Sequence, residues 1–64
     1  MAKETMQEFV EIDETGNERD WINPVISMQE TEAGFVIDNG CHTYEVIKQK
    51  GWKYITRIKE YGDG

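Results

Sequence analysis

The chain has 64 residues, of which 38% are hydrophobic and 31% charged, and its formal net charge is −6. A chain this short forms one domain, expected over 1–64 with flexible tails at 1–6 and 62–64, and it has little room for both a core and an enclosed catalytic cleft. No apolar run approaches the roughly 18 residues of a membrane span, and no secretory signal is recognisable at the N-terminus. We therefore expect a cytoplasmic domain that is not an enzyme, and the single cysteine, Cys41, fits a reducing compartment.

The N-terminal third is expected to form two strands joined by a turn. Residues 9–12 and 19–22 are rich in strand-forming side chains, and the polar cluster at 13–17 has the composition of a turn. A short N-terminal helix is the alternative, because Thr5 and Glu8 resemble a capping box and the apolar positions 6, 9 and 10 have helical spacing.

The middle of the chain predicts a further strand after a bend. Pro24 lacks a backbone donor, so it is expected to mark a bend or the start of the next strand. Polar and apolar residues alternate over 25–30, which places Ile26 and Met28 on one face. A loop of two or four residues around 31–34 keeps that face continuous with the apolar face of the strand that follows.

The segment 34–58 reads as three strands joined by two glycine turns. Asn39-Gly40 predicts a two-residue type I′ hairpin loop that pairs Asp38 with Cys41. At 48–51 the loop has two or three residues; the three-residue form is preferred, with Gly51 in the left-handed region and Lys48 paired with Trp52. One face of this sheet then carries the larger apolar side chains, together with His42 and Thr56: Phe35, Ile37, Tyr44, Val46, Trp52, Tyr54 and Ile58.

These elements predict an all-β fold, a small antiparallel meander of four or five strands that forms a twisted sheet or a partly closed barrel. The apolar face needs a cover. We expect the N-terminal strands, with Trp21 and Ile22, to provide it, and a homodimer is the alternative. Both tryptophans, Trp21 and Trp52, are expected in the core.

No pattern indicates a catalytic residue, a cofactor or a metal site. Cys41 and His42 are the only residues of their kinds, and neighbours in a strand face opposite sides. We expect Cys41 to be a small strand residue and His42 to lie at a sheet edge. The segment 13–20 resembles a calcium loop only vaguely, because its glycine is at the fourth position, so we interpret it as a solvated turn.

Charge is distributed unevenly along the chain. Residues 1–40 hold ten of the 13 acidic side chains, and residues 41–64 hold five of the 7 cationic ones. The simpler interpretation is that acidic strands pair with basic strands within the domain. The functional interpretation is an acidic surface directed at a basic partner.

Three functional hypotheses follow. The first is a small acidic protein-interaction module, an inhibitor or adaptor acting on a basic or nucleic-acid-binding protein, through Glu11, Glu14, Glu18, Asp20 and Trp21. The second is a nucleic-acid-binding barrel that uses Lys48, Lys50, Trp52, Lys53, Arg57 and Lys59, which the overall negative charge disfavours. The third is a structural homo-oligomeric subunit. Small acidic proteins of this kind are often accessory products of mobile elements.

Overall fold

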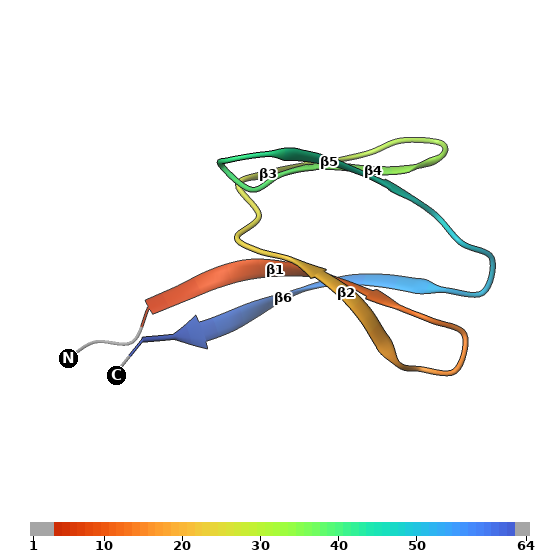
Figure 1. Cartoon of the computed structure of the whole chain (residues 1–64), viewed down its shortest axis with the longest axis horizontal. Coiled ribbons are helices and arrows are strands. Elements are labelled where there is room, and N and C mark those ends of the chain that lie inside the picture. The colour runs from red at the N-terminus through yellow and green to blue at the C-terminus, as the bar shows by residue number, and fades with distance from the viewer. Residues whose placement is uncertain (1–3, 63–64) are drawn as a thin grey trace.

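The structure of the protein is a computed structural model that describes residues 4–62. Six strands form two antiparallel three-stranded sheets (Figure 1). The strands are β1 (Glu4–Ile12), β2 (Glu18–Ile22), β3 (Ser27–Glu30), β4 (Gly34–Asp38), β5 (Thr43–Ile47) and β6 (Lys53–Tyr61). Over residues 4–62 no helix is present, so the all-β prediction is confirmed.

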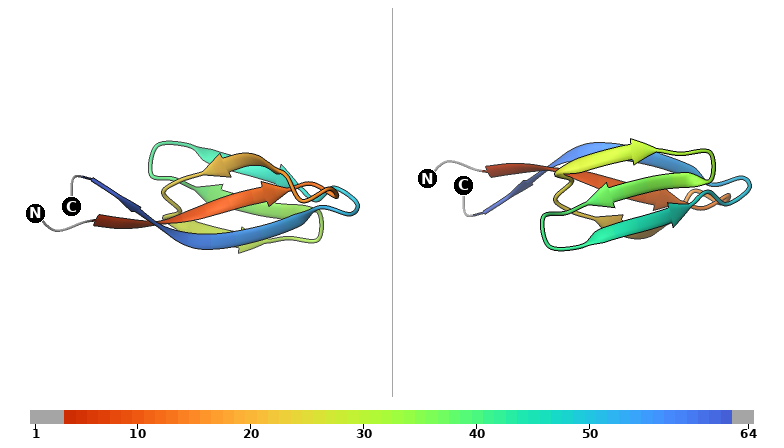
Figure 2. Two further views of the ribbon diagram at one scale, coloured as in Figure 1. Left: turned by 90° about the horizontal axis from the view of Figure 1, so that it is seen from below. Right: turned by 90° about the horizontal axis from the view of Figure 1, so that it is seen from above.

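The two sheets, ordered β2-β1-β6 and β3-β4-β5, pack face to face as two layers. Figure 2 shows β1 over β4, β2 over β5, and β6 over β3. The described strands are consistent with the predicted small antiparallel meander, but they are divided between two sheets that do not close into a barrel, and their number, six, exceeds the predicted four or five.

The N-terminal hairpin is formed by β1 and β2, as expected, and the helix alternative is wrong. Phe9 faces the second sheet while Val10 faces outward, which is the alternation of a strand. β1 begins at Glu4 and pairs with β6 as far as Tyr61, so the predicted tail is wrong at 4–6. The tail predictions at 1–3 and 63–64 lie outside the described residues.

The hairpin turn is organised by Asp13, whose side chain is buried. Its Oδ1 accepts hydrogen bonds from the backbone N–H groups of Thr15 and Asn17, both at 2.9 Å, and from the Thr15 hydroxyl at 2.7 Å. The prediction of a turn is confirmed, but the carboxylate at its centre is not solvated, because it satisfies the donors of the turn itself.

The β3–β4 hairpin has the predicted faces. Met28 lies opposite Ile37, and Glu30 lies opposite Phe35, as a four-residue loop requires. Pro24 lies in the connection between β2 and β3, where the Asn23–Pro24 peptide bond is cis.

The β4–β5 loop is longer than predicted. Asp38 pairs with Thr43, so four residues form the loop. Gly40 has a φ of 96°, but Asn39 does not have the positive φ that a type I′ turn requires. The Asn39 Oδ1 instead accepts hydrogen bonds from the N–H groups of Cys41 and His42 at 2.9 and 2.8 Å. These two residues therefore lie in the loop and not in a strand.

The difference in register is two residues, which leaves the predicted apolar face of this hairpin intact. Tyr44 is now opposite Ile37, and Val46 is opposite Phe35. Because side chains alternate with a period of two, a shift of two residues exchanges partners without exchanging faces.

The segment after β5 does not form a hairpin, and the predicted pairing of Lys48 with Trp52 is wrong. Gly51 has the expected left-handed conformation, with a φ of 82°. Here, however, the chain crosses to the other layer, and β6 pairs with β1 over nine residue pairs. The Tyr54 hydroxyl holds this crossover by accepting a hydrogen bond from the Gln49 N–H at 2.6 Å.

The core lies between the layers and is centred on Phe9, Ile37 and Val46. The rings of Phe9, Phe35 and Tyr54 come from three strands in both sheets, and their centroids are 5.2–6.1 Å apart. The expected intramolecular cover is therefore confirmed, with β6 as its additional strand. Ile58, predicted on the covered face, is 67% exposed because it lies beyond the end of this core.

Gly34 has no space for a side chain, because a Cβ atom there would overlap the carbonyl oxygen of Val46 in β5. We expect Gly34→Ala to lower the free energy of unfolding by at least about 2 kcal/mol. Gly16→Ala is the matched control: Gly16 has a φ of 89° and open space around it, so only backbone strain of about 1 kcal/mol is expected. Urea denaturation compares the two variants, and equal losses would contradict the close approach at Gly34.

Candidate functional site

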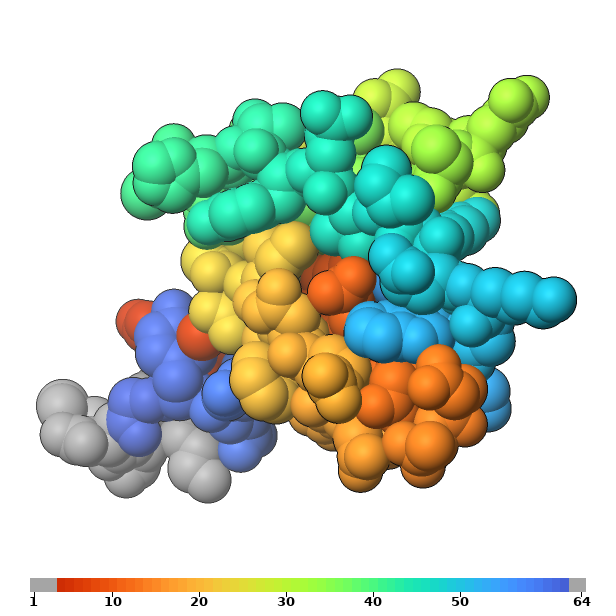
Figure 3. All heavy atoms as spheres, turned by 45° about the vertical axis from the view of Figure 1, so that its right-hand side comes forward, coloured from red at the N-terminus to blue at the C-terminus, as the bar shows by residue number. Residues whose placement is uncertain are grey.

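A groove runs along the open side of the molecule between the edge strands β2 and β5. Its volume is about 560 Å³. In Figure 3 the teal β5 and the gold β2 flank this hollow, and orange atoms of β1 are visible between them. It is lined by Glu11, Asp20, Trp21, Ile22, Asn23, Asn39, Tyr44, Glu45, Val46, Ile47 and Gln49.

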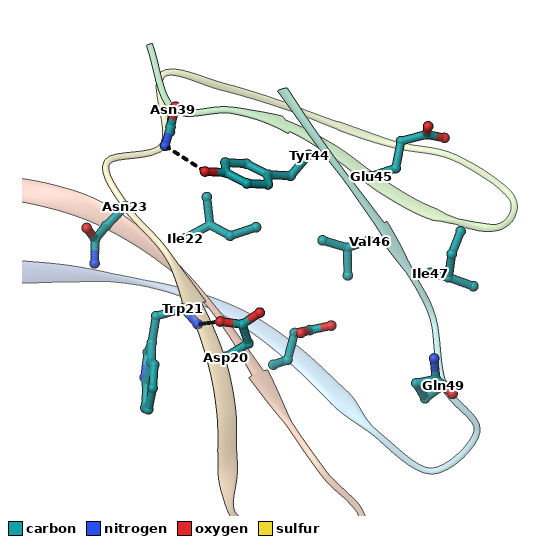
Figure 4. A pocket seen from close by; sticks show the side chains of 11 residues that line it. Asp20, Trp21, Ile22, Asn23, Asn39, Tyr44, Glu45, Val46, Ile47 and Gln49 are labelled. Atoms are coloured by element: carbon teal, nitrogen blue, oxygen red, sulfur yellow. Dashed lines mark hydrogen bonds between the residues drawn. The ribbon is translucent and has the colours of Figure 1, made fainter. Parts of the chain in front are cut away.

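The two ends of the groove differ in chemistry (Figure 4). At one end the Asn39 side-chain amide donates to the Tyr44 hydroxyl at 3.4 Å, with Asn23 and Ile22 nearby. At the other end lie Asp20 and Gln49, and Val46 lies between the two groups. An apolar wall thus leads from an amide and phenol end to an acidic end.

The acidic end contains two carboxylates that face each other across a strand pair. Glu11 of β1 is directly opposite Asp20 of β2. Partial burial of Glu11, together with the charge of Asp20, raises the pKa of the Glu11 carboxyl. Asp20 accepts a hydrogen bond from the backbone N–H of Trp21 at 2.8 Å. Among residues 4–62, no lysine or arginine forms an ion pair with either carboxylate.

A different set of charges covers the outer face of the β2-β1-β6 sheet. The side chain of Glu8 is only 1% exposed and accepts hydrogen bonds from Arg57 Nε at 2.9 Å and from the Asn23 amide at 2.7 Å. Arg57 also donates to both carboxylate oxygens of Glu18 at 2.9 and 3.0 Å. We call Glu8, Glu18 and Arg57 the outer ion network.

The outer ion network gives its carboxylates unusual acidity. Hydrogen bonds from Arg57 and then Trp21 lower the pKa of Glu18 to about 2. Burial opposes ionisation of Glu8, but the hydrogen bonds from Asn23 and Arg57 and the nearby cations together lower its pKa. The predicted pairing of acidic N-terminal strands with basic C-terminal ones is therefore present on this face.

The predicted partner-binding residues are divided between the two faces. Glu11 and Asp20 meet in the groove. Glu18 does not, because it belongs to the outer ion network, and Glu14 lies in the β1–β2 turn beside Gly51. Trp21 is one of the residues that line the groove. Its indole, however, points away from the groove (Figure 4) and donates a hydrogen bond to Glu18 at 2.8 Å.

The expectation of two core tryptophans is wrong for Trp21, which is 49% exposed. Trp21 lies opposite Val10 in the sheet, so it faces outward, where no third layer covers it. Trp52 is half-buried.

The residues of the nucleic-acid hypothesis are mostly engaged within the domain. The Lys48 ammonium is 2.6 Å from Glu30 and lies over the Phe35 ring. Arg57 belongs to the outer ion network, and Lys59 is 3.8 Å from Glu8. Of the cations in this set, only Lys50 and Lys53 form no ion pair within the described part of the chain.

Sequence reasoning missed most of the groove. Ile22, Asn23, Asn39, Tyr44, Val46 and Gln49 line it, and none was predicted as a site residue. These positions come together only because β2 packs over β5. The charge pattern identified Glu11 and Asp20, but no local signal marks the segments opposite them.

Comparison with known proteins gives no relative: no family model, curated protein or solved structure matches the chain. Within residues 4–62, no three side chains of the His, Cys, Asp and Glu types are grouped closely enough to hold a metal ion. No helix that could cross a bilayer is found in the same residues.

Removing the arginine of the outer ion network should destabilise the fold. In Arg57→Ala the buried Glu8 carboxylate keeps Asn23 and the more distant Lys59 as partners, so we expect a loss of about 2 kcal/mol in the free energy of unfolding. Arg57→Lys should recover only part of it, because an ammonium cannot reproduce the paired bonds to Glu18. Urea denaturation at neutral pH measures both, and an unchanged midpoint for Arg57→Ala would contradict this role.

Acid should remove the same stabilisation. Glu8 and Glu18 have lowered pKa values in the folded state, so the stability they contribute is present above their ordinary pKa of 4.5 and is lost as the pH falls toward about 2. Glu11 has a raised pKa and acts in the opposite direction. Denaturation curves across this range should show a steep decline for the wild type and a shallower one for Arg57→Ala; parallel curves would contradict the assignment.

Proposed function

We propose that the protein is a small acidic interaction module that binds a basic segment of a partner protein in the groove between β2 and β5. The observation that carries the proposal is the Glu11–Asp20 pair, two carboxylates opposite each other with no cationic partner among the described residues. In this proposal the module acts in the cytoplasm as an inhibitor or adaptor.

The physical argument is one of electrostatic cost. Like charges directly opposite each other in a sheet are destabilising. Partial burial adds to this cost at Glu11, as its raised pKa indicates. A lysine or arginine from a partner would remove the repulsion, and it would do so in a recess where water screens the attraction less than on an open surface.

The arrangement of the cations supports a protein partner over a nucleic acid. Lys48, Arg57 and Lys59 already contact acidic groups of the domain, and the net charge of −6 repels phosphates. If the partner's basic surface itself binds nucleic acid, the acidic groove competes with phosphate for it. The groove also disfavours self-association through this site, because two copies would bring four carboxylates together.

Neutralising the groove pair should weaken binding while stabilising the fold. For Glu11→Gln with Asp20→Asn we expect a free energy of unfolding at neutral pH higher by about 0.5 kcal/mol, because the cross-strand repulsion is removed. The same variant should lose most of a basic protein that immobilised wild type captures from a host extract at low salt. Mass spectrometry identifies and quantifies that protein, and higher salt should release it from the wild type.

The matched control is Glu14→Gln with Glu32→Gln, which changes the net charge equally at two exposed positions outside the groove. This control should capture the same protein as the wild type. Equal loss in both double variants would point to net charge and not to the groove. Undiminished capture by the groove variant would refute the proposed site.

A further inference from the structure

The edge of β5 presents unpaired backbone groups beside the groove. Two hydrogen bonds bracket the β4–β5 ladder: Asn39 N–H to His42 C=O at 3.1 Å, and Lys48 N–H to Ala33 C=O at 2.9 Å. In an antiparallel pair, alternate residues direct both backbone groups to the neighbouring strand. Tyr44 and Val46 therefore point theirs to β4, and the residues that point theirs to the open edge are Thr43, Glu45 and Ile47.

The open-edge donors of β5 have no partner within the described part of the chain. No hydrogen bond outside the ladders uses the N–H of Thr43, Glu45 or Ile47. The Ile47 carbonyl lies 3.5 Å from the Tyr54 hydroxyl, which fixes the end of the strand. Apart from that carbonyl, the open edge of β5 offers donors and acceptors without a partner among the described residues, the features to which another strand can add.

The other edge of the groove, on β2, is less open to strand addition. On β2 the N–H of Trp21 is already bonded to the Asp20 carboxylate at 2.8 Å. β6 has a longer open edge, but it lies on the opposite side of the molecule, over β3, and carries Lys53, Arg57 and Lys59 (Figure 2). A basic segment is therefore expected at β5 and not at β6.

We propose that the basic partner segment binds as an added β-strand along the open edge of β5, so that it closes the groove between the two sheets. This inference rests on the proposed function, and it specifies the partner as an extended segment in which a cationic side chain and an apolar side chain lie two residues apart. Backbone hydrogen bonds to β5 hold the segment, and the side chains that face the groove select it.

The groove determines which side chains would fit. Side chains of an added strand alternate between the outer surface and the groove. Those facing the groove meet Tyr44 and Val46 along one wall and the Glu11–Asp20 pair at the acidic end. An apolar residue fits the wall, and a lysine or arginine two residues away reaches the carboxylates. Glu45 points away from the groove (Figure 4) and would adjoin the outward-facing side chains of the added strand.

The test uses a defined probe, the capped peptide Thr-Lys-Thr-Val-Thr-Lys-Thr, titrated into the full chain at low salt. Two forms with methylated backbone nitrogens are compared with it. One carries the methyl groups on the amides of the threonines, and the other carries them on the amides of the lysines and the valine. In an added strand only alternate amides face β5. We therefore expect one form to bind at least about tenfold more weakly than the parent peptide and the other to bind nearly as well.

Amide hydrogen exchange gives an independent readout. Addition of the parent peptide should slow exchange at Thr43, Glu45 and Ile47, and it should leave the open-edge amides of β6 unchanged. On the protein side, Glu45→Pro removes one open-edge donor without removing a ladder bond, and it should weaken binding. Glu45→Ala keeps that donor and should bind more tightly than Glu45→Pro.

The outcomes separate the two proposals. If both N-methylated forms bind as well as the parent, or both lose affinity equally, strand addition is refuted. In that case, if the groove variant with Glu11→Gln and Asp20→Asn binds all three peptides more weakly than the wild type does, the acidic groove still stands as a site for basic partners. If the parent peptide does not bind the wild type at all, both proposals fail. The peptide measurements decide the matter even if Glu45→Pro does not fold.

Discussion

The contact between the two layers is the constraint on which the rest of the structure depends. No described strand of one sheet pairs with a strand of the other, so the sheets are joined by connecting segments, by side-chain packing and by the bond from the Tyr54 hydroxyl to the Ile47 carbonyl. Phe9 is fully buried at the centre of this contact, against the rings of Phe35 and Tyr54. Burial of such a side chain contributes about 2–3 kcal/mol, a large share of the stability of so small a domain. The relative position of β2 and β5, and with it the groove, follows from this packing.

A two-layer domain leaves the outer faces of its sheets without a cover, and here charged side chains provide one. Val10 faces outward from β1, yet it is completely buried. Its neighbours across the strands include Trp21, whose indole is bonded to Glu18, and Arg57 then links Glu18 to Glu8. Long side chains can cover apolar surface with their stems while their charged ends stay hydrated. The cations used in this way are not available to a partner.

The groove has the opposite character, because its charges are not matched within the domain. Glu11 and Asp20 repel each other in a partly buried site, while arginine and lysine side chains are paired elsewhere. Locally unfavourable arrangements in natural proteins often mark functional sites. The open edge of β5 is a second unsatisfied feature on the same side of the molecule. An extended basic segment would satisfy both, which is why we connect them.

The sequence by itself determined the all-β class, the turn at Asp13 and the face that the apolar side chains of β3, β4 and β5 share. These properties depend on the two-residue alternation of strands and on local turn chemistry, so they persist even where the β4–β5 loop has four residues in place of two. The acidic composition also identified Glu11 and Asp20. Only the tertiary structure decided that β6 pairs with β1 and that Tyr44 and Asn39 face the acidic strands across a groove. Those choices depend on contacts between distant segments, where burial of Phe9 and the Glu8–Arg57 ion pair outweigh the local preference for a hairpin after β5.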